Sequence, residues 1–251
     1  MQRYKLTIAY DGTLFCGWQR QPEPVRTVQR IVELAAGQIV NHPVTVHGSS
    51  RTDTGVHAEG QVAQMDAETH IGQDPAKGGP DRLRMAINSR MPSDALITEL
   101  QPVEMAFDAS AAVRKRYRYQ IWAAPDRPVF NRQFMYHYYQ PLHLAPMAEA
   151  CRHFVGTQDF IAFRGSGDER ENTVRTIFAA DIRQEGPLIT FGIEGSGFMY
   201  HMVRNIVGTL IEVGRGHWAA GRIPEIIASR DRQQAGGCAP AQGLCLEWIR
   251  F

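Results

Sequence analysis

Residues 44–63 read VTVHGSSRTDTGVHAEGQVA, and this stretch decides how the chain around it is organised. Val44 and Val46 at one end and Val62 at the other are apolar, β-branched residues typical of strands. Between them, residues 48–57 are polar and rich in small side chains. The pattern therefore predicts a strand, an irregular loop and a second strand.

Alternating strand and helix signals continue on both sides of this stretch. Strand patterns are expected at 4–10, 95–100, 113–123, 173–183, 188–194 and 244–251, and helix patterns at 27–40, 81–90, 146–155, 198–213 and 222–230. This mixture favours an α+β fold, a mostly antiparallel sheet with helices on one side. We place the domain boundary near residue 105, giving an N-terminal domain over 1–104 and a C-terminal domain over 105–251.

Composition limits the classes of protein to consider. The 251 residues include 27 Lys and Arg against 26 Asp and Glu, so the formal charge is only +1, although a local basic face stays possible. The four cysteines form no C-x-x-C pair, which excludes a zinc ribbon and argues against a disulfide scaffold. Because no apolar run is long enough for a membrane helix, we expect a cytoplasmic protein without membrane contact.

The loop at 48–57 is the first candidate for chemistry. Arg51 and Asp53 are two residues apart, so in an extended loop the arginine could orient the carboxylate and lower its pKa. An ionised, oriented carboxylate suits a nucleophile or a general base. Gly48 and Gly55 would allow sharp turns and close approach of a substrate. The alternative is a surface turn with a capping Asp and a solvated Arg.

The second candidate is the run Arg-Lys-Arg-Tyr-Arg-Tyr at 114–119. On a strand, Tyr117 and Tyr119 share one face, while Arg116 and Arg118 share the other. Such a strand offers rings for stacking on bases and charge for phosphates. The alternative is an amphipathic strand with core tyrosines and a solvated basic edge.

The third candidate is the apolar helix pattern that Arg204 and Asn205 interrupt. A buried arginine needs an acidic partner, for which Asp53 is a candidate; otherwise Arg204 lies exposed on the polar face. His57 has no partner at metal-ligand spacing, so a structural role is favoured. No phosphate-loop or nucleophile-elbow motif occurs, and we expect neither a cofactor nor a metal.

Together these motifs resemble the tRNA pseudouridine synthase A family. The resemblance is carried, in family order, by Tyr10-Asp11-Gly12 with Gly17-Trp18-Gln19-Arg20-Gln21, the 48–57 loop with Gly60-Gln61-Val62, Tyr117-Arg118-Tyr119, His201-Met202-Val203-Arg204-Asn205-Ile206, and Ala239-Pro240-Ala241-Gln242-Gly243-Leu244. It spans nearly the whole chain. Two departures are Ser110-Ala111, where the family has an Arg-aromatic pair, and a 72–80 loop longer than usual.

The resemblance implies two ferredoxin-like (RRM-like) halves joined into one sheet, with a central, basic RNA-binding cleft. It implies a homodimer that isomerises uridines 38, 39 and 40 in the tRNA anticodon stem-loop without a cofactor. Asp53 matches the essential catalytic aspartate, and Arg51 and Arg204 match the arginines that hold it. Tyr117 matches the tyrosine that packs on the target uracil. Asp53 could attack ribose C1′, add to uracil C6 or remove the C2′ proton.

An RNA substrate also requires basic side chains where the phosphates lie. The candidates are Arg20, Arg26, Arg30, Arg114, Lys115, Arg116, Arg164 and Arg204. Two rival functions are a non-catalytic RNA-binding module and a carboxylate-dependent glycosidase. The first gives no reason for Arg51 and Asp53 in a glycine-bounded loop, and the second usually needs two carboxylates.

Overall fold

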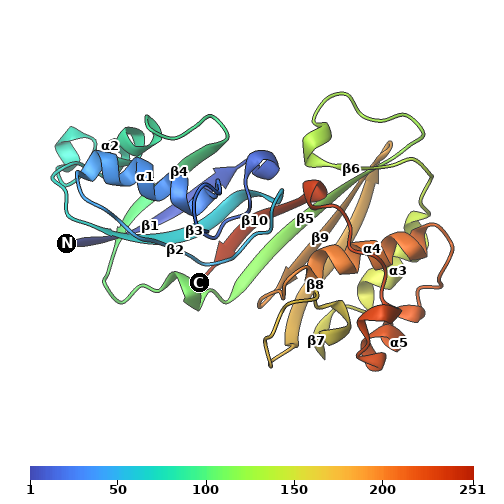
Figure 1. Cartoon of the computed structure of the whole chain (residues 1–251). Coiled ribbons are helices and arrows are strands. Elements are labelled where there is room, and N and C mark those ends of the chain that lie inside the picture. The colour runs from blue at the N-terminus through green and yellow to red at the C-terminus, as the bar shows by residue number, and fades with distance from the viewer. The chain divides into compact units, whose positions relative to one another are not determined.

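The structure is a computed structural model that describes residues 1–251, the side chain of Lys77 excepted. The chain divides into two compact units, whose residues can be followed in Figure 1 by the colour scale of residue number. The first unit comprises Met1–Ala112 and Leu246–Phe251, and the second comprises Val113–Cys245. Each unit is described separately below. Whether they are independent folding domains with a boundary near residue 105 stays a prediction.

The first unit follows the order βαββαβ. Its elements are β1 (Gln2–Tyr10), α1 (Val28–Val40), β2 (Val46–Gly48), β3 (His57–Ala67), α2 (Gly79–Asn88) and β4 (Ala95–Val103), and most of β10 (Leu244–Arg250) joins them from the end of the chain. The strand order is β4-β1-β3, with β2 and β10 also beside β3, and β1 pairs antiparallel with both β3 and β4. This is a ferredoxin-like arrangement.

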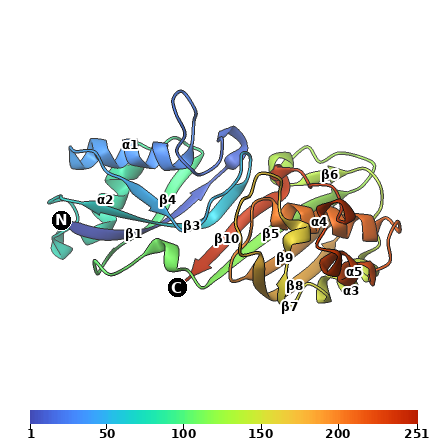
Figure 2. The same ribbon diagram turned by 60° about the horizontal axis from the view of Figure 1, so that its bottom comes forward.

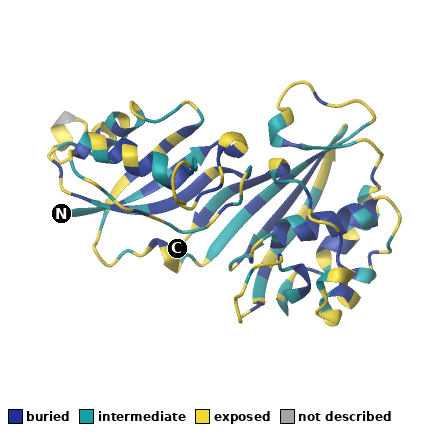
Figure 3. Cartoon of the chain, in the orientation of Figure 1, coloured by how far each residue is buried: buried dark blue, intermediate teal, exposed yellow. Residues whose placement is uncertain are grey.

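Alternation along β1 explains how the first unit buries its core. Tyr4, Leu6, Ile8 and Tyr10 are buried, whereas the residues between them are partly exposed. Helix α1 adds an apolar face, and α1 and α2 contact each other over one side of the strands (Figures 1 and 2). The dark bands on one side of these helices in Figure 3 mark the buried face. Hydrophobic burial therefore fixes the strands from which the 48–57 loop projects.

The second unit has a related plan, βαββα, formed by β5, α3, β8, β9 and α4, with two short strands and a further helix added. Its elements are β5 (Arg114–Ala123), β6 (Tyr136–Tyr138), α3 (Leu144–Arg152), β7 (Gly156–Asp159), β8 (Val174–Glu185), β9 (Leu188–Gly195), α4 (Met202–Gly214) and α5 (Arg222–Ser229). The strand order is β5-β9-β8-β7, with antiparallel neighbours, and β6 pairs parallel with β5. Helix α3 packs against α4 and β8.

The predicted α+β class is confirmed, and the differences are local. The helix expected from 198 begins at Met202, because His201 has a left-handed backbone with φ of 57°. The short strands β6 and β7 were not predicted. The expected 72–80 loop contains a 3-10 turn at Pro75–Lys77 and the first residues of α2. Other 3-10 turns lie at Gly12–Leu14, Ala109–Ala111, Arg132–Phe134, Ile161–Phe163, Arg232–Gln234 and Ala241–Gly243.

Within the described part of the chain, we find no helix with both the length and the apolar character needed to span a bilayer.

Candidate active site

The 48–57 loop of the first unit connects β2 to β3, and its first residues are tied to β3. The backbone N–H of Ser49 donates to the carbonyl of Val62 at 2.8 Å. The side-chain amide of Gln61 donates to the carbonyl of Ser50 at 2.6 Å, and Gln61 is fully buried. A buried amide that bonds the loop backbone limits its movement, so the residues that follow Ser50 start from a fixed position.

Asp53 follows a buried residue, Thr52, that is held from two directions. The Thr52 hydroxyl lies 2.8 Å from the Tyr10 hydroxyl, and its carbonyl accepts from the backbone N–H of Trp18 at 3.1 Å. The carbonyl of Asp53 accepts from the N–H of Val56 at 3.1 Å, which closes a turn. Asp53 itself is half-buried. Its carboxylate is therefore carried on a backbone that is fixed on both sides.

The neighbouring Arg51 is exposed, in contrast to Asp53. Its guanidinium is therefore accessible to an anionic group from solvent. At the other end of the loop, His57 is buried, and its Nδ1 accepts from the backbone N–H of Gly12 at 2.9 Å. This bond ties the turn after β1 to the start of β3, in agreement with the structural role favoured for His57.

The segment Gly17–Gln21 packs against the same loop. Gly17 has a φ of 82°, and a Cβ there would lie 2.6 Å from the carbonyl oxygen of Thr52. Only glycine fits this backbone conformation and this close approach. The next residue, Trp18, is 1% exposed and lies 6.3 Å from Tyr10 between ring centroids. A Cβ at Gly48 would lie 2.3 Å from Trp18 Nε1, so the Trp18 ring packs directly against the start of the loop.

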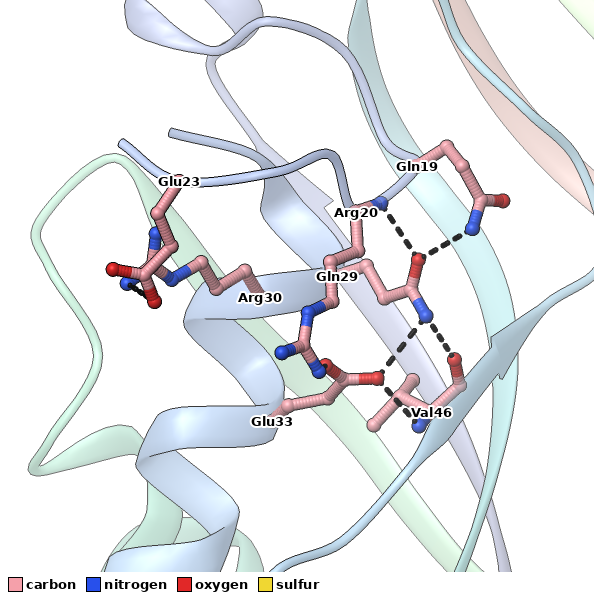
Figure 4. Close-up of polar contacts among 7 residues, drawn as sticks. All are labelled: Gln19, Arg20, Glu23, Gln29, Arg30, Glu33 and Val46. Atoms are coloured by element: carbon pink, nitrogen blue, oxygen red, sulfur yellow. Dashed lines mark hydrogen bonds and ion pairs between the residues drawn. The ribbon is translucent and has the colours of Figure 1, made fainter. Parts of the chain in front are cut away.

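A buried polar network from α1 positions the rest of this segment (Figure 4). The side-chain oxygen of Gln29 accepts from the N–H of Arg20 at 2.8 Å and from the amide of Gln19 at 2.9 Å. Its amide nitrogen donates to the carbonyl of Val46 at 2.9 Å and to Glu33 at 3.0 Å. One side chain of α1 thus links the segment after Trp18 to strand β2.

The second unit carries the tyrosines that the sequence singled out. Along β5, Tyr117 and Tyr119 are buried, as strand alternation predicts. The Tyr117 ring lies edge-on to Phe198, with 5.3 Å between centroids and an interplanar angle of 88°. The Tyr119 hydroxyl donates to the carbonyl of Pro240 at 2.7 Å, and burial raises the pKa of Tyr119 well above its usual value. Tyr119 is therefore a neutral, structural hydrogen-bond donor.

The opposite face of β5 is basic, but two of its arginines are paired with carboxylates. Arg116 Nη2 donates to Asp181 at 2.8 Å. Arg114 Nε lies 2.6 Å from Glu194 Oε1, an ion pair without the alignment of a hydrogen bond. Since these guanidinium groups already contact acidic partners within the protein, the excess of charge expected on this strand is reduced.

Contacts with other segments explain why two polar residues, Arg204 and Asn205, interrupt the apolar pattern of helix α4. Arg204 Nε donates to the carbonyl of Ala239 at 2.7 Å, and the N–H of Ala239 donates back to the carbonyl of Arg204 at 3.1 Å. Asn205 is buried, donates to the carbonyl of Phe163 at 2.8 Å and accepts from Arg232 at 2.9 Å. Asn205 is thus structural, and Arg204 is held by the Ala239–Leu244 segment.

The four predicted site residues lie in different units. Arg51 and Asp53 belong to the first unit, and Tyr117 and Arg204 belong to the second. Sequence reasoning did not identify the supporting role of Gln29 or the edge contact of Phe198. A buried glutamine in the apolar stripe of a helix is the signal that could have indicated the former.

Comparisons with known proteins agree on one family. A family model described as tRNA pseudouridine synthase matches residues 6–110 and 150–251. A tRNA pseudouridine synthase A of Acetivibrio thermocellus is 43% identical over 252 residues, covering all of both chains. Proteins of Clostridium perfringens and Streptococcus thermophilus, named tRNA pseudouridine synthase A 2 and tRNA pseudouridine synthase A, are 41% and 39% identical, again with full coverage of both chains.

Proposed function

The chain belongs to the tRNA pseudouridine synthase family and is an isomerase of tRNA uridines, and we propose that it converts uridines 38, 39 and 40 of the anticodon stem-loop to pseudouridine. In this proposal Asp53 is the essential catalytic carboxylate. The observation that carries it is the fixed backbone around Asp53, held through Thr52 by Tyr10 and Trp18. A carboxylate kept in place before the substrate arrives needs little reorganisation during reaction.

The reaction itself explains why one carboxylate suffices. The bond from ribose C1′ to uracil N1 breaks, a bond from C1′ to C5 forms, C5 loses its proton and N1 gains one. Nothing is oxidised, reduced or hydrolysed, so the atoms balance without a co-reactant. Asp53 acts at the sugar or the base by attack on C1′, addition to C6 or removal of the C2′ proton.

Tyr117 is proposed to stack on the target uracil and retain it while it turns. Its edge contact with Phe198 limits rotation of the ring and supports this role. Base–aromatic stacking is worth about 1–3 kcal/mol, sufficient to retain a detached base briefly. Because a stacked base is inaccessible in a helix, the nucleotide flips out first. The proposal requires Asp53 and Tyr117, from different units, to reach the same nucleotide.

The two arginines have different proposed tasks. Arg51 is exposed, which suits a contact with RNA phosphate or occupation of the gap left by the flipped nucleotide. Arg204 is proposed to orient Asp53 and keep it ionised. Its Nε donates to the carbonyl of Ala239 at 2.7 Å, and this bond holds the Arg204 side chain in place.

We further propose that the protein contacts the anticodon stem-loop of tRNA and that a homodimer is its active form. We also propose a cytoplasmic location, because tRNA processing occurs in the cytoplasm. The family names of the relatives support tRNA as the substrate. The dimer and the stem-loop specificity follow from the resemblance of the motifs that surround Asp53, Tyr117 and Arg204.

The direct test is to incubate the purified protein with an unmodified tRNA transcript and map pseudouridine by nucleotide position. We expect product at 38–40 without added metal or nucleotide. Product confined to other positions would contradict the site specificity. Release of free uracil would indicate a glycosidase, and tRNA binding without any product would indicate a binding module.

A further inference from the structure

Helix α1 begins against an earlier segment of the first unit. The first N–H groups of a helix have no partner within the helix, and the N-cap side chain usually satisfies one of them. Here the N-cap residue, Thr27, makes no such bond. The N–H of Val28 donates instead to the carbonyl of Gly17 at 3.2 Å. The N–H of Gln29 donates to the carbonyl of Trp18 at 3.0 Å, so the start of α1 fixes the backbone of the earlier segment.

This earlier segment, which starts at Phe15, is bonded to the 48–57 loop on both sides of Asp53. The N–H of Trp18 donates to the carbonyl of Thr52 at 3.1 Å. The N–H of Gly55 donates to the carbonyl of Phe15 at 3.3 Å. One bond therefore lies before Asp53 in the chain and the other lies after it. A movement of the segment would move the backbone that carries the carboxylate.

The side chain of Gln29 joins the same segment to strand β2, from which the loop starts. Its oxygen accepts from the N–H of Arg20 at 2.8 Å, and its nitrogen donates to the carbonyl of Val46 at 2.9 Å (Figure 4). Gln29 is only 8% exposed, and hydrogen bonds are stronger where water is excluded. Strand β2 ends at Gly48, directly before the loop. Gln29 thus holds both segments that border the turn of Asp53.

The amide of Gln29 has a partner for each of its two donors and two acceptor sites. The oxygen accepts from the side chain of Gln19 at 2.9 Å in addition to the N–H of Arg20. The nitrogen donates to Glu33 at 3.0 Å in addition to the carbonyl of Val46. An amide can make no more than these four bonds, so its orientation is fully determined.

The two segments that Gln29 joins are also packed closely against the loop. The Trp18 ring approaches Gly48 so nearly that a Cβ there would lie 2.3 Å from Nε1. A Cβ at Gly17 would lie 3.2 Å from the carbonyl carbon of Asp53. Close-packed groups transmit a displacement because there is no space to absorb it. A shift of either segment therefore reaches the backbone of Asp53.

We infer that Gln29 is a positioning residue for the isomerisation, because it holds the backbone of Asp53 through the segment before α1 and through β2. This inference rests on the proposed function, since it takes Asp53 as the catalytic carboxylate. A displacement of about 1 Å can slow a reaction about a hundredfold. Loss of the Gln29 amide should therefore slow the chemical step and leave the affinity for tRNA unchanged.

The test compares Gln29→Met with Asn88→Leu in the full chain. Methionine is similar in length to glutamine and lacks its amide. Asn88 is the matched control, because it joins α2 to β4 of the same unit by the same kind of bonds. Its amide donates to the carbonyl of Ile97 at 2.8 Å and accepts from the N–H of Ile97 at 2.9 Å. Strand β1 lies between β4 and the strand that follows the loop, β3.

Rates are measured in single turnovers, with enzyme in excess over an unmodified tRNA transcript, and Kd is measured separately. We expect Gln29→Met to react about tenfold to a hundredfold more slowly than wild type, with Kd changed by less than about twofold. Asn88→Leu should keep the wild-type rate even where it lowers the melting temperature as much. A wild-type rate for Gln29→Met, a loss confined to Kd, or equal slowing of both variants would overturn the inference.

Hydrogen exchange of backbone amides tests the positioning without using activity. The informative groups are the N–H of Trp18, bonded to Thr52, and the N–H of Val56, bonded to Asp53. Both should exchange faster in Gln29→Met and at the wild-type rate in Asn88→Leu. Unchanged exchange at both positions in Gln29→Met would contradict the inference. If Gln29→Met does not fold, Gln29→Asn, whose amide is one methylene shorter, replaces it with the same expectations.

Failure of the proposed function can be told apart from failure of this inference by measuring Asp53→Asn in the same experiment. If Asp53→Asn reacts at the wild-type rate, the proposed role of Asp53 is wrong and the inference falls with it. If Asp53→Asn is inactive while Gln29→Met reacts as wild type does, the inference alone is wrong. An inactive Asp53→Asn together with a slowed Gln29→Met of normal affinity supports both.

Discussion

At the scale of single residues, Thr52 and Tyr10 fix the backbone that leads directly into Asp53. Neither side chain takes part in the proposed isomerisation. Their hydroxyl groups lie 2.8 Å apart and are buried at the base of the loop. Sequence patterns mark Asp53 as a candidate because of its spacing from Arg51. They do not reveal the bond to Tyr10, because the partners are 42 residues apart.

We predict that Thr52→Val lowers the free energy of unfolding by about 1 kcal/mol, because the hydroxyl bond to Tyr10 is lost with little change in volume. Tyr10→Phe should have a similar effect. In a double-mutant cycle measured by urea unfolding, the two changes should be less than additive. Strict additivity would show that the two hydroxyls are not coupled.

Because of Lys115, the free energy of unfolding of the tRNA-free protein should depend on pH. For Lys115, the folded pKa of about 8 lies below the usual 10.5, chiefly because of burial. Between these values the unfolded chain binds more protons, so the free energy of unfolding should rise as pH increases from 7 to 9. Lys115→Met should remove that rise. Urea unfolding at pH 7, 8 and 9 measures it, and an unchanged rise in the variant would contradict the assignment.

At the scale of elements, helices α1 and α4 serve as supports for site segments. Helix α1 uses Gln29 and Glu33 to hold the segment after Trp18 and strand β2. Helix α4 holds the Ala239–Leu244 segment through the backbone and side chain of Arg204. In both cases, polar residues on a mostly apolar helix face have a structural function.

Glu33→Ala should destabilise the protein by about 1–3 kcal/mol, because the buried N–H of Val46 loses its acceptor. Glu33→Gln keeps an acceptor oxygen and loses only the ion pair to Arg20, at 3.3 Å, so its effect should be smaller. Thermal melting of both variants tests this prediction. Equal losses would mean that the backbone bond contributes little.

Gly208→Ala in α4 distinguishes packing from helix propensity. Alanine normally stabilises a helix by about 1 kcal/mol relative to glycine. Here a Cβ would lie 1.7 Å from the carbonyl oxygen of Gly237, so the segment that reaches Ala239 must move. We therefore expect a loss of about 1–3 kcal/mol in urea unfolding. A gain in stability would show that this segment is not packed on α4.

At the scale of the whole molecule, the sequence allowed the fold class and most long elements to be predicted. Burial alternates clearly along β1 and β5, which is why those strands were identified. The short strands β6 and β7 lack enough residues to show a period. The start of α4 was misplaced, because His201 has a left-handed backbone, and the apolar helical spacing of the sequence does not mark that conformation.

The candidate site was predicted less completely than the fold. Motifs gave Asp53, Arg51, Tyr117 and Arg204, but not the interactions that support them. Several arginines expected to bind phosphate are paired with acidic residues that lie far away in the sequence, as Arg26 is with Asp94. Pairing across such distances is invisible in a single sequence, which is why these arginines were expected to be available to phosphate.

The central claim is that Asp53 carries the isomerisation, and release of tritium from a transcript labelled at uracil C5 tests it most directly. Forming the bond from C1′ to C5 expels that hydrogen, so each turnover releases one label. Under single-turnover conditions, with tRNA binding measured alongside, we predict that Asp53→Asn binds tRNA as wild type does but releases tritium at least about a thousandfold more slowly. Release by Asp53→Asn at the wild-type rate would contradict the account.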